Sequence, residues 1–218
     1  MMNKFLLVSL LIALFSCGHS RKGANSIDTL PYYNNASFTP HWFNPDDAAL
    51  DTFHRIPSFN LINQEGKAVT EKSFDGKIYV TDFFFTSCPG ICPKMTANMA
   101  VLQDTFMNDQ DVLLLSHSAT PNIDSVSVLK AYAQEKGVLA DKWHLVTGDI
   151  NEIYALGRKQ YFVEEDLGLT RKADDFLHTE NFVLIDKDRH IRGIYNGLNR
   201  TSINQLIGDI RTLQREGK

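Results

Sequence analysis

The chain is poor in cysteine, with only three thiols among 218 residues, at Cys17, Cys88 and Cys92. It also lacks a basic cluster, because 22 basic residues are outnumbered by 26 acidic ones and the formal charge is −4. This balance cannot neutralise a phosphate backbone, so we expect no nucleic-acid partner. There is no internal repeat, no low-complexity tract and no sign of a second domain. Length and composition therefore suit one soluble domain with extra length at one end.

The beginning of the chain has no apolar run long enough to cross a bilayer as a mature helix. Lys4 precedes an apolar run over residues 5–15, interrupted only by Ser9, which is typical of a secretory signal. The following L-F-S-C resembles the lipobox of bacterial lipoproteins, so Cys17 is the predicted lipidation site. An ordinary signal cut nearby, or a signal anchor, is the alternative. Both place the protein outside the cytoplasm, in the cell envelope, and the lipid would hold it on the membrane.

These features predict three segments. Residues 1–17 would be the signal peptide, residues 18–54 a tether and N-terminal extension, and residues 55–218 the folded domain. Aromatic residues between positions 32 and 43 are too many to leave in solvent, so this part of the extension should lie against the domain.

Cys88 and Cys92 lie where a buried strand gives way to a helix. Residues 78–85 are rich in aromatic and β-branched side chains, and helical spacing resumes at Met95. A helix N-terminus favours a thiolate, so we expect both thiols to be more acidic than a free cysteine, whose pKa is about 8.5. Two such thiols can form a disulfide or bind a soft metal ion. The alternative is a pair of buried, inert cysteines.

The remaining pattern alternates strands with helices. We predict a hairpin at 56–70, strands at 111–118 and 142–149, helices opening at Pro121 and over 151–160, an exposed loop at 162–176, a closing hairpin at 181–195, and a final amphipathic helix from Ile203 to Leu213. The fold class is α/β, with a central mixed sheet flanked by helices and an N-terminal hairpin extension. With a cysteine pair at the first strand-to-helix turn, this order is similar to the thioredoxin fold.

Two segments, F-F-T-S-C-P-G-I-C-P at 84–93 and L-H-T-E-N-F-V-L-I-D at 177–186, resemble the Sco/SenC family of copper proteins. The resemblance covers roughly residues 56–213. It implies a membrane-attached metallochaperone that assists assembly of the Cu-A site of cytochrome c oxidase, and copper, as Cu(I) or Cu(II), bound by Cys88, Cys92 and His178. The implied partners are the oxidase subunit carrying the Cu-A site and a copper donor or thiol reductant protein.

Several alternatives stay open. The same cysteine pair would serve a thiol-disulfide oxidoreductase, so enzymatic activity is uncertain, although copper delivery needs no turnover. Two thiols and a histidine would also suit zinc, and Lys94 near the pair would suit a peroxidase-type relative. His117 ends a strand at the same sheet edge and competes with His178 as a ligand or supporting group.

Two further details bear on the site. Met95 and Met99 are soft donors, but their spacing makes them core residues. The family commonly has S-x-D-P-x-x-D-T after its second buried strand; Pro121 and Asp124 fit this pattern, whereas Thr120 stands where the first aspartate would be.

Overall fold

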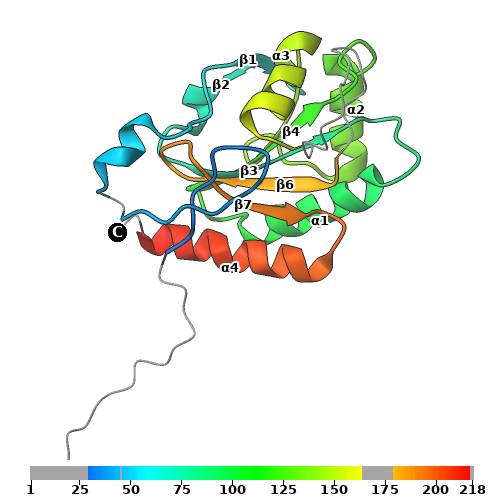
Figure 1. Ribbon diagram of the computed structural model, residues 1–218. Coiled ribbons are helices and arrows are strands. Elements are labelled where there is room, and N and C mark those ends of the chain that lie inside the picture. The colour runs from blue at the N-terminus through cyan, green and yellow to red at the C-terminus, as the bar shows by residue number, and fades with distance from the viewer. Residues whose placement is uncertain (1–28, 45, 164–178, 217–218) are drawn as a thin grey trace, which may run out of the picture.

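The computed structural model describes residues 29–44, 46–163 and 179–216. These residues form a seven-stranded mixed sheet in the order β2-β1-β5-β4-β3-β6-β7 (Figure 1). The strands are β1 (Asn60–Asn63), β2 (Ala68–Thr70), β3 (Ile78–Phe84), β4 (Val112–Ser118), β5 (Trp143–Thr147), β6 (Asn181–Ile185) and β7 (Ile191–Asn196). Strands β3, β4 and β5 are parallel, and the hairpins β1–β2 and β6–β7 extend the two sides in antiparallel fashion.

The helices are α1 (Cys92–Thr105), α2 (Val126–Lys136), α3 (Ile150–Ala155) and α4 (Arg200–Glu216). A π-helical turn, η3 (Leu156–Gln160), continues α3, and two short 3-10 turns, η1 (Ala48–Thr52) and η2 (Glu71–Phe74), precede β3 in the chain. Within the described part of the chain, no helix is both long and apolar enough to cross a membrane.

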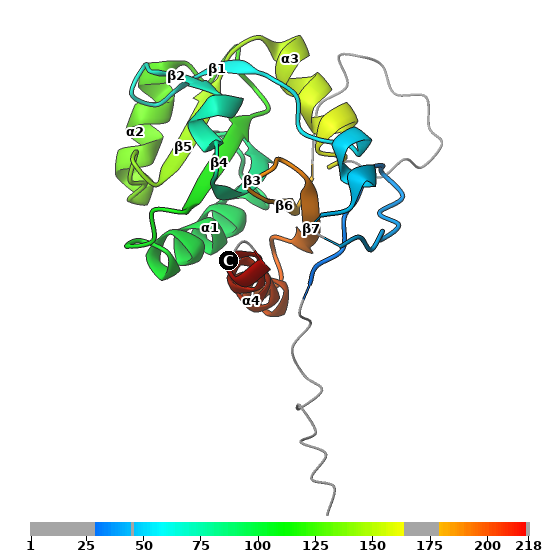
Figure 2. The same ribbon diagram turned by 90° about the vertical axis from the view of Figure 1, so that its left-hand side faces the viewer.

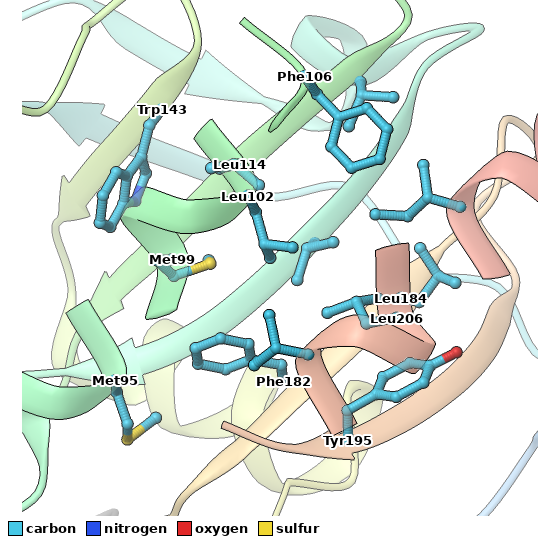
Figure 3. Packing of buried hydrophobic residues seen from close by; sticks show 14 of the residues in the cluster. Met95, Met99, Leu102, Phe106, Leu114, Trp143, Phe182, Leu184, Tyr195 and Leu206 are labelled. Carbon is cyan, nitrogen blue, oxygen red and sulfur yellow. The ribbon is translucent and has the colours of Figure 1, made fainter. Parts of the chain in front are cut away.

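Strand β3 lies in the interior of the sheet, and all seven of its residues are buried. It pairs with β4 on one side and β6 on the other, which explains why its residues are mostly apolar. Helices α1 and α4 pack on one face, where Met99 and Leu102 of α1 and Leu206 of α4 surround Leu114 and Leu184 (Figures 2 and 3). A second cluster, which includes side chains of α3, covers the opposite face. The layered arrangement confirms the predicted mixed sheet with a thioredoxin-like order.

The N-terminal hairpin is confirmed, with Gly66 in the left-handed region at φ 74° in its turn. The predicted start of the second helix at Pro121 is wrong, because α2 begins at Val126. Ser125 has an extended backbone and its side chain accepts a hydrogen bond from the amide of Val128, so it caps the helix. Ile123, which would lie inside a helix that began at Pro121, lies before α2 and is 62% exposed.

The predicted exposed loop at 162–176 falls mostly on residues outside the described part of the chain. Its first two residues are described, and Val163 is buried in the second cluster rather than exposed. The final helix is confirmed as amphipathic, since Ile203, Leu206, Ile210 and Leu213 are buried along one side of α4.

The described part of the N-terminal extension lies against β7, as predicted from its aromatic residues. Arg192 is the anchor: its guanidinium lies 3.8 Å from the centre of the Tyr32 ring and donates hydrogen bonds to the carbonyls of Leu30 and Pro31. The same guanidinium forms ion pairs with Asp186 at 3.0 Å and Glu216 at 2.8 Å. Trp42 is an exception among the aromatics, because it is 60% exposed.

We predict that Arg192→Met lowers the free energy of unfolding by about 3–5 kcal/mol, because Asp186 and Glu216 would remain buried without their cation. Denaturant unfolding monitored by circular dichroism measures this change. Lys136→Met removes one member of a more exposed ion pair with Glu135 and should cost no more than about 1 kcal/mol. Equal losses in the two variants would contradict the assignment of Arg192 as the anchor.

Candidate functional site

The two cysteines lie at the edge of the sheet where the parallel strands end. Strand β3 ends at Phe84, and the turn that follows carries Cys88 and leads into α1, whose first residue is Cys92. Pro93 stands in the first turn of that helix, where its missing amide hydrogen costs nothing. Cys88 is partly exposed, whereas Cys92 is only 4% exposed. Both thiols are free, and one of them is accessible to a partner.

The turn gives the two thiols unequal acidity. Partial burial disfavours the charged form of Cys88, but hydrogen bonds from the Cys92 thiol and from the amides of Cys92, Gly90 and Ile91 outweigh it and lower the pKa of Cys88. Burial raises the pKa of Cys92, and its hydrogen bond to Cys88 raises it further. The expectation that both thiols are acidified is therefore correct for Cys88 and wrong for Cys92. The cause is location: Cys88 is surrounded by donors, while Cys92 points into the core.

A buried carboxyl group lies in the sheet on the same face as Cys92. Asp82 of β3 accepts a short hydrogen bond from the hydroxyl of Ser116, which in turn accepts one from Trp143 Nε1 at 2.8 Å. Burial raises the pKa of Asp82 to about 7, although the Ser116 hydrogen bond works in the opposite direction. Asp82 belongs to no motif of the sequence. The available signal was a carboxylate inside a strand whose other residues suit complete burial.

His117 does not join the cysteines. It lies on β4 opposite Phe83, and its ring stacks on the Phe83 ring with centroids 4.6 Å apart, in the cluster on the far face from Cys92. Its Nδ1 lies 3.1 Å from Thr81 Oγ1, and its Nε2 has no hydrogen-bond partner among the described residues. Burial lowers its pKa to about 3, so the ring is neutral. The alternative that His117 is a ligand is therefore wrong: alternation along the strand directs it into the core.

Among the described residues, no group of three or more His, Cys, Asp or Glu side chains is gathered to hold a metal ion. His178 lies outside the described residues, as does Cys17. The strand after His178 is placed, however: β6 pairs antiparallel with β3, with Thr81 opposite Val183. The first residues of β6 therefore lie at the edge where β3 ends. Thr179 is buried there and donates a hydrogen bond to the carbonyl of Val163 at 2.7 Å.

Met95 and Met99 are completely buried in the core between α1 and the sheet, as their spacing predicted (Figure 3). Lys94, which the peroxidase-type alternative needs beside a reactive thiol, is exposed on α1. The donors that the described residues bring to this edge are thus the two sulfurs. Their chemistry suits a soft ion or a disulfide.

A thioredoxin-like fold with two thiols of unequal acidity at the strand ends is typical of two classes of protein, dithiol redox proteins and thiol-based metal carriers. Comparison with known proteins is more specific. A family model described as SCO1/SenC matches residues 48–215. The chain therefore belongs to the SCO1/SenC family.

Individual relatives agree with this assignment. The SCO1 protein homolog of Bacillus subtilis (strain 168) is 32% identical over 164 residues, which cover 73% of this chain and 82% of the relative. A solved SCO1/SenC family lipoprotein from Bacillus anthracis str. Ames superimposes with a TM-score of 0.64 at 30% identity, covering 76% of this chain and 96% of that one. Arabidopsis thaliana ScoI, solved with copper bound, gives a TM-score of 0.55 at 26% identity, covering 71% and 97%.

We predict that Asp82 makes stability depend on pH. The pKa of Asp82 in the folded protein, about 7, exceeds its ordinary value of 3.8. Its contribution to the free energy of unfolding is therefore complete below pH 3.8 and is lost as the pH rises to about 7. The stability of the wild type relative to Asp82→Asn should fall by a few kcal/mol, in order of magnitude, between about pH 4 and about pH 8. Denaturant unfolding of both reduced, metal-free proteins across this range measures the difference. A difference that does not change with pH would contradict the assignment.

Proposed function

We propose that the protein is a copper metallochaperone that assists assembly of the Cu-A site of cytochrome c oxidase. The observation that carries this proposal is the pair of free thiols at the open edge of the sheet, one accessible and one buried. Thiolates are the ligands that Cu(I) prefers, and imidazole suits both copper states. The copper bound to a family member at 26% identity supports the same reading.

The proposed ligands are Cys88, Cys92 and His178. The antiparallel pairing of β6 with β3 supports His178, since it directs the chain before β6 toward the edge that bears the thiols. Transfer would proceed by ligand exchange, in which ligands of the incoming protein replace the two sulfurs one at a time. Cys88 would be released first, because it is the exposed sulfur. No enzymatic turnover is required.

We further propose that the protein acts at the outer side of a membrane. The predicted lipid on Cys17 would anchor it there, with residues 18–54 as tether and extension and residues 55–218 as the copper domain. A solved relative that is a lipoprotein supports this. The proposed recipient is the oxidase subunit that carries the Cu-A site, and a copper donor or thiol reductant protein would load the dithiol.

We predict that the reduced protein retains one copper ion per chain after desalting, and that Cys88→Ser or Cys92→Ser abolishes this retention. His178→Ala should weaken Cu(II) binding more than Cu(I) binding, because the two thiolates still satisfy the softer ion. Competition titrations with chelators for each copper state measure both affinities.

His41→Ala is the matched control for His178→Ala. His41 lies in the N-terminal extension, stacked on Phe43, and its removal should leave both copper affinities unchanged. Reduced wild-type protein that loses all copper on desalting would refute the copper proposal, and a His178→Ala variant identical to wild type would remove His178 from the ligand set.

The unequal acidity of the thiols favours one second function, thiol-disulfide exchange. The Cys88 thiolate would attack a partner's disulfide and release one partner thiol; Cys92 would then attack Cys88, releasing the second partner thiol and leaving the Cys88–Cys92 disulfide. Its reduction by a dithiol protein would complete the cycle.

For this second function we predict that Cys92→Ser traps a mixed disulfide with a small disulfide substrate, whereas Cys88→Ser does not, because Cys92 is buried and its pKa is raised. Mass spectrometry of the non-reduced proteins detects the adduct. Adducts on both variants at equal rates would contradict the assigned order of attack.

A further inference from the structure

The turn that carries Cys88 is attached to a completely buried carboxylate, Asp124, in the segment between β4 and α2. Four hydrogen bonds converge on it. Oδ1 accepts one from Thr86 Oγ1 at 2.5 Å, and Oδ2 accepts three, from the Thr86 amide at 3.3 Å, Ser118 Oγ at 2.6 Å and Thr120 Oγ1 at 3.0 Å. A buried carboxylate is tolerated when donors surround it in this way, and such charge-assisted bonds are stronger than neutral ones.

The four donors come from two sides of the site. Ser118 and Thr120 belong to the end of β4 and the residues after it, and they hold the carboxylate in place. Thr86 belongs to the turn after β3, two residues before Cys88, and gives the carboxylate both its amide and its hydroxyl. The amide of Ala119 also donates to the carbonyl of Phe84 at 2.7 Å, so the two segments run side by side up to this point.

The two cysteines are thus positioned by different parts of the fold. Cys92 is the first residue of α1 and is fixed by the packing of that helix on the sheet. Cys88 lies in the turn, and the bonds of Thr86 to Asp124 fix the base of that turn. We propose that Asp124 is a positioning residue for the dithiol, which holds Thr86 and thereby sets the place of Cys88 relative to Cys92. This rests on the dithiol being the working site, as the proposed function requires.

Thr120 takes part in this arrangement through two hydrogen bonds. The Thr120 hydroxyl donates to Asp124, and its amide donates to Ser118 Oγ at 3.1 Å. An aspartate at position 120 would bring a second acceptor to the same place instead of a donor. In this chain the segment is therefore built to hold one carboxylate and to turn it toward Thr86.

A pair of variants separates positioning from stability, because Thr86 and Ser118 donate to the same carboxylate at similar distances. Thr86→Val keeps the shape of the side chain but removes the hydroxyl bond on the side of the cysteine turn. Ser118→Ala removes a comparable bond on the β4 side. Both should lower the free energy of unfolding, but only Thr86→Val should loosen Cys88.

The first measurement is the equilibrium between the Cys88–Cys92 disulfide and a glutathione redox buffer at one fixed pH, with full-length protein. It reports how effectively the fold holds the two sulfurs together. We expect Thr86→Val to lower the equilibrium constant for forming the Cys88–Cys92 disulfide about tenfold, which corresponds to a change in reduction potential of about 30 mV. Ser118→Ala should change it less than about twofold, and Thr86→Ser, which restores the hydroxyl, should recover the wild-type value. Asp124→Asn should act in the same direction as Thr86→Val.

The second measurement is Cu(I) affinity by chelator competition, where we expect Thr86→Val to lose about tenfold and Ser118→Ala to stay near wild type. The proposal is overturned if Thr86→Val and Ser118→Ala lower stability equally and leave the glutathione equilibrium equally unchanged. If the wild type binds no copper, the proposed function fails, yet the glutathione equilibrium still decides the role of Asp124. If Asp124→Asn does not fold, the Thr86 and Ser118 variants still decide it.

Discussion

The hydrogen bonds that converge on the sulfur of Cys88 are the interaction on which the rest of the site depends. They come from the Cys92 thiol and from amides of the turn, and they act on a side chain that is only partly buried. Without them, burial would disfavour the charged form of both sulfurs, and the pair would be two poorly reactive thiols. With them, the fold offers one accessible thiol whose pKa is lowered and one buried thiol whose pKa is raised. Each proposed chemistry begins at Cys88 for this reason.

Copper binding and disulfide exchange make different demands on the same pair. Binding Cu(I) through both sulfurs requires that Cys92 lose its proton inside the core, where burial raises its pKa. The metal must supply the free energy for that step, so copper loading releases protons and weakens as the solution becomes acidic. Disulfide exchange needs the Cys92 thiolate only briefly, after Cys88 has been consumed. In the proposed copper carrier, the two sulfurs would hold the ion, and the partial exposure of Cys88 would give a partner access to it.

Much of the fold was predictable from the sequence because local and global preferences agree. The run from Ile78 to Phe84 is mostly apolar and is buried on both faces, as its composition predicts, and only Thr81 and Asp82 interrupt it. The start of α2 was missed because Pro121 is a good helix opener, and nothing local shows that Asp124 is needed as a buried acceptor. The misassigned acidity of Cys92 has a similar origin. Spacing placed the residue at a helix N-terminus, but only the packed structure shows that it points inward.

His117 shows that a position near the end of a parallel strand is not enough to predict a metal ligand. It was a reasonable ligand because it lies near the end of a parallel strand, but alternation along β4 sends its ring to the face opposite Cys92. Asp82 shows the converse, since it belongs to no motif and yet lies on the same face of the sheet as Cys92. A residue near the end of a strand can contribute to a site at that edge only if its side chain points to the same face of the sheet as the other ligands.

The two ends of the sheet have separate tasks. The strand register places Ile185 opposite Tyr79 and beside Ile191. Arg192 and the extension it binds therefore lie near the N-terminal end of β3. The cysteines lie where it ends. Leu30, whose amide donates to Glu216, therefore joins the domain at the end away from the thiols. The described part of the N-terminal extension thus lies at the opposite end of β3 from the dithiol. A partner that approaches the sulfurs closely enough to exchange ligands therefore meets the edge where β3 ends and not the described extension.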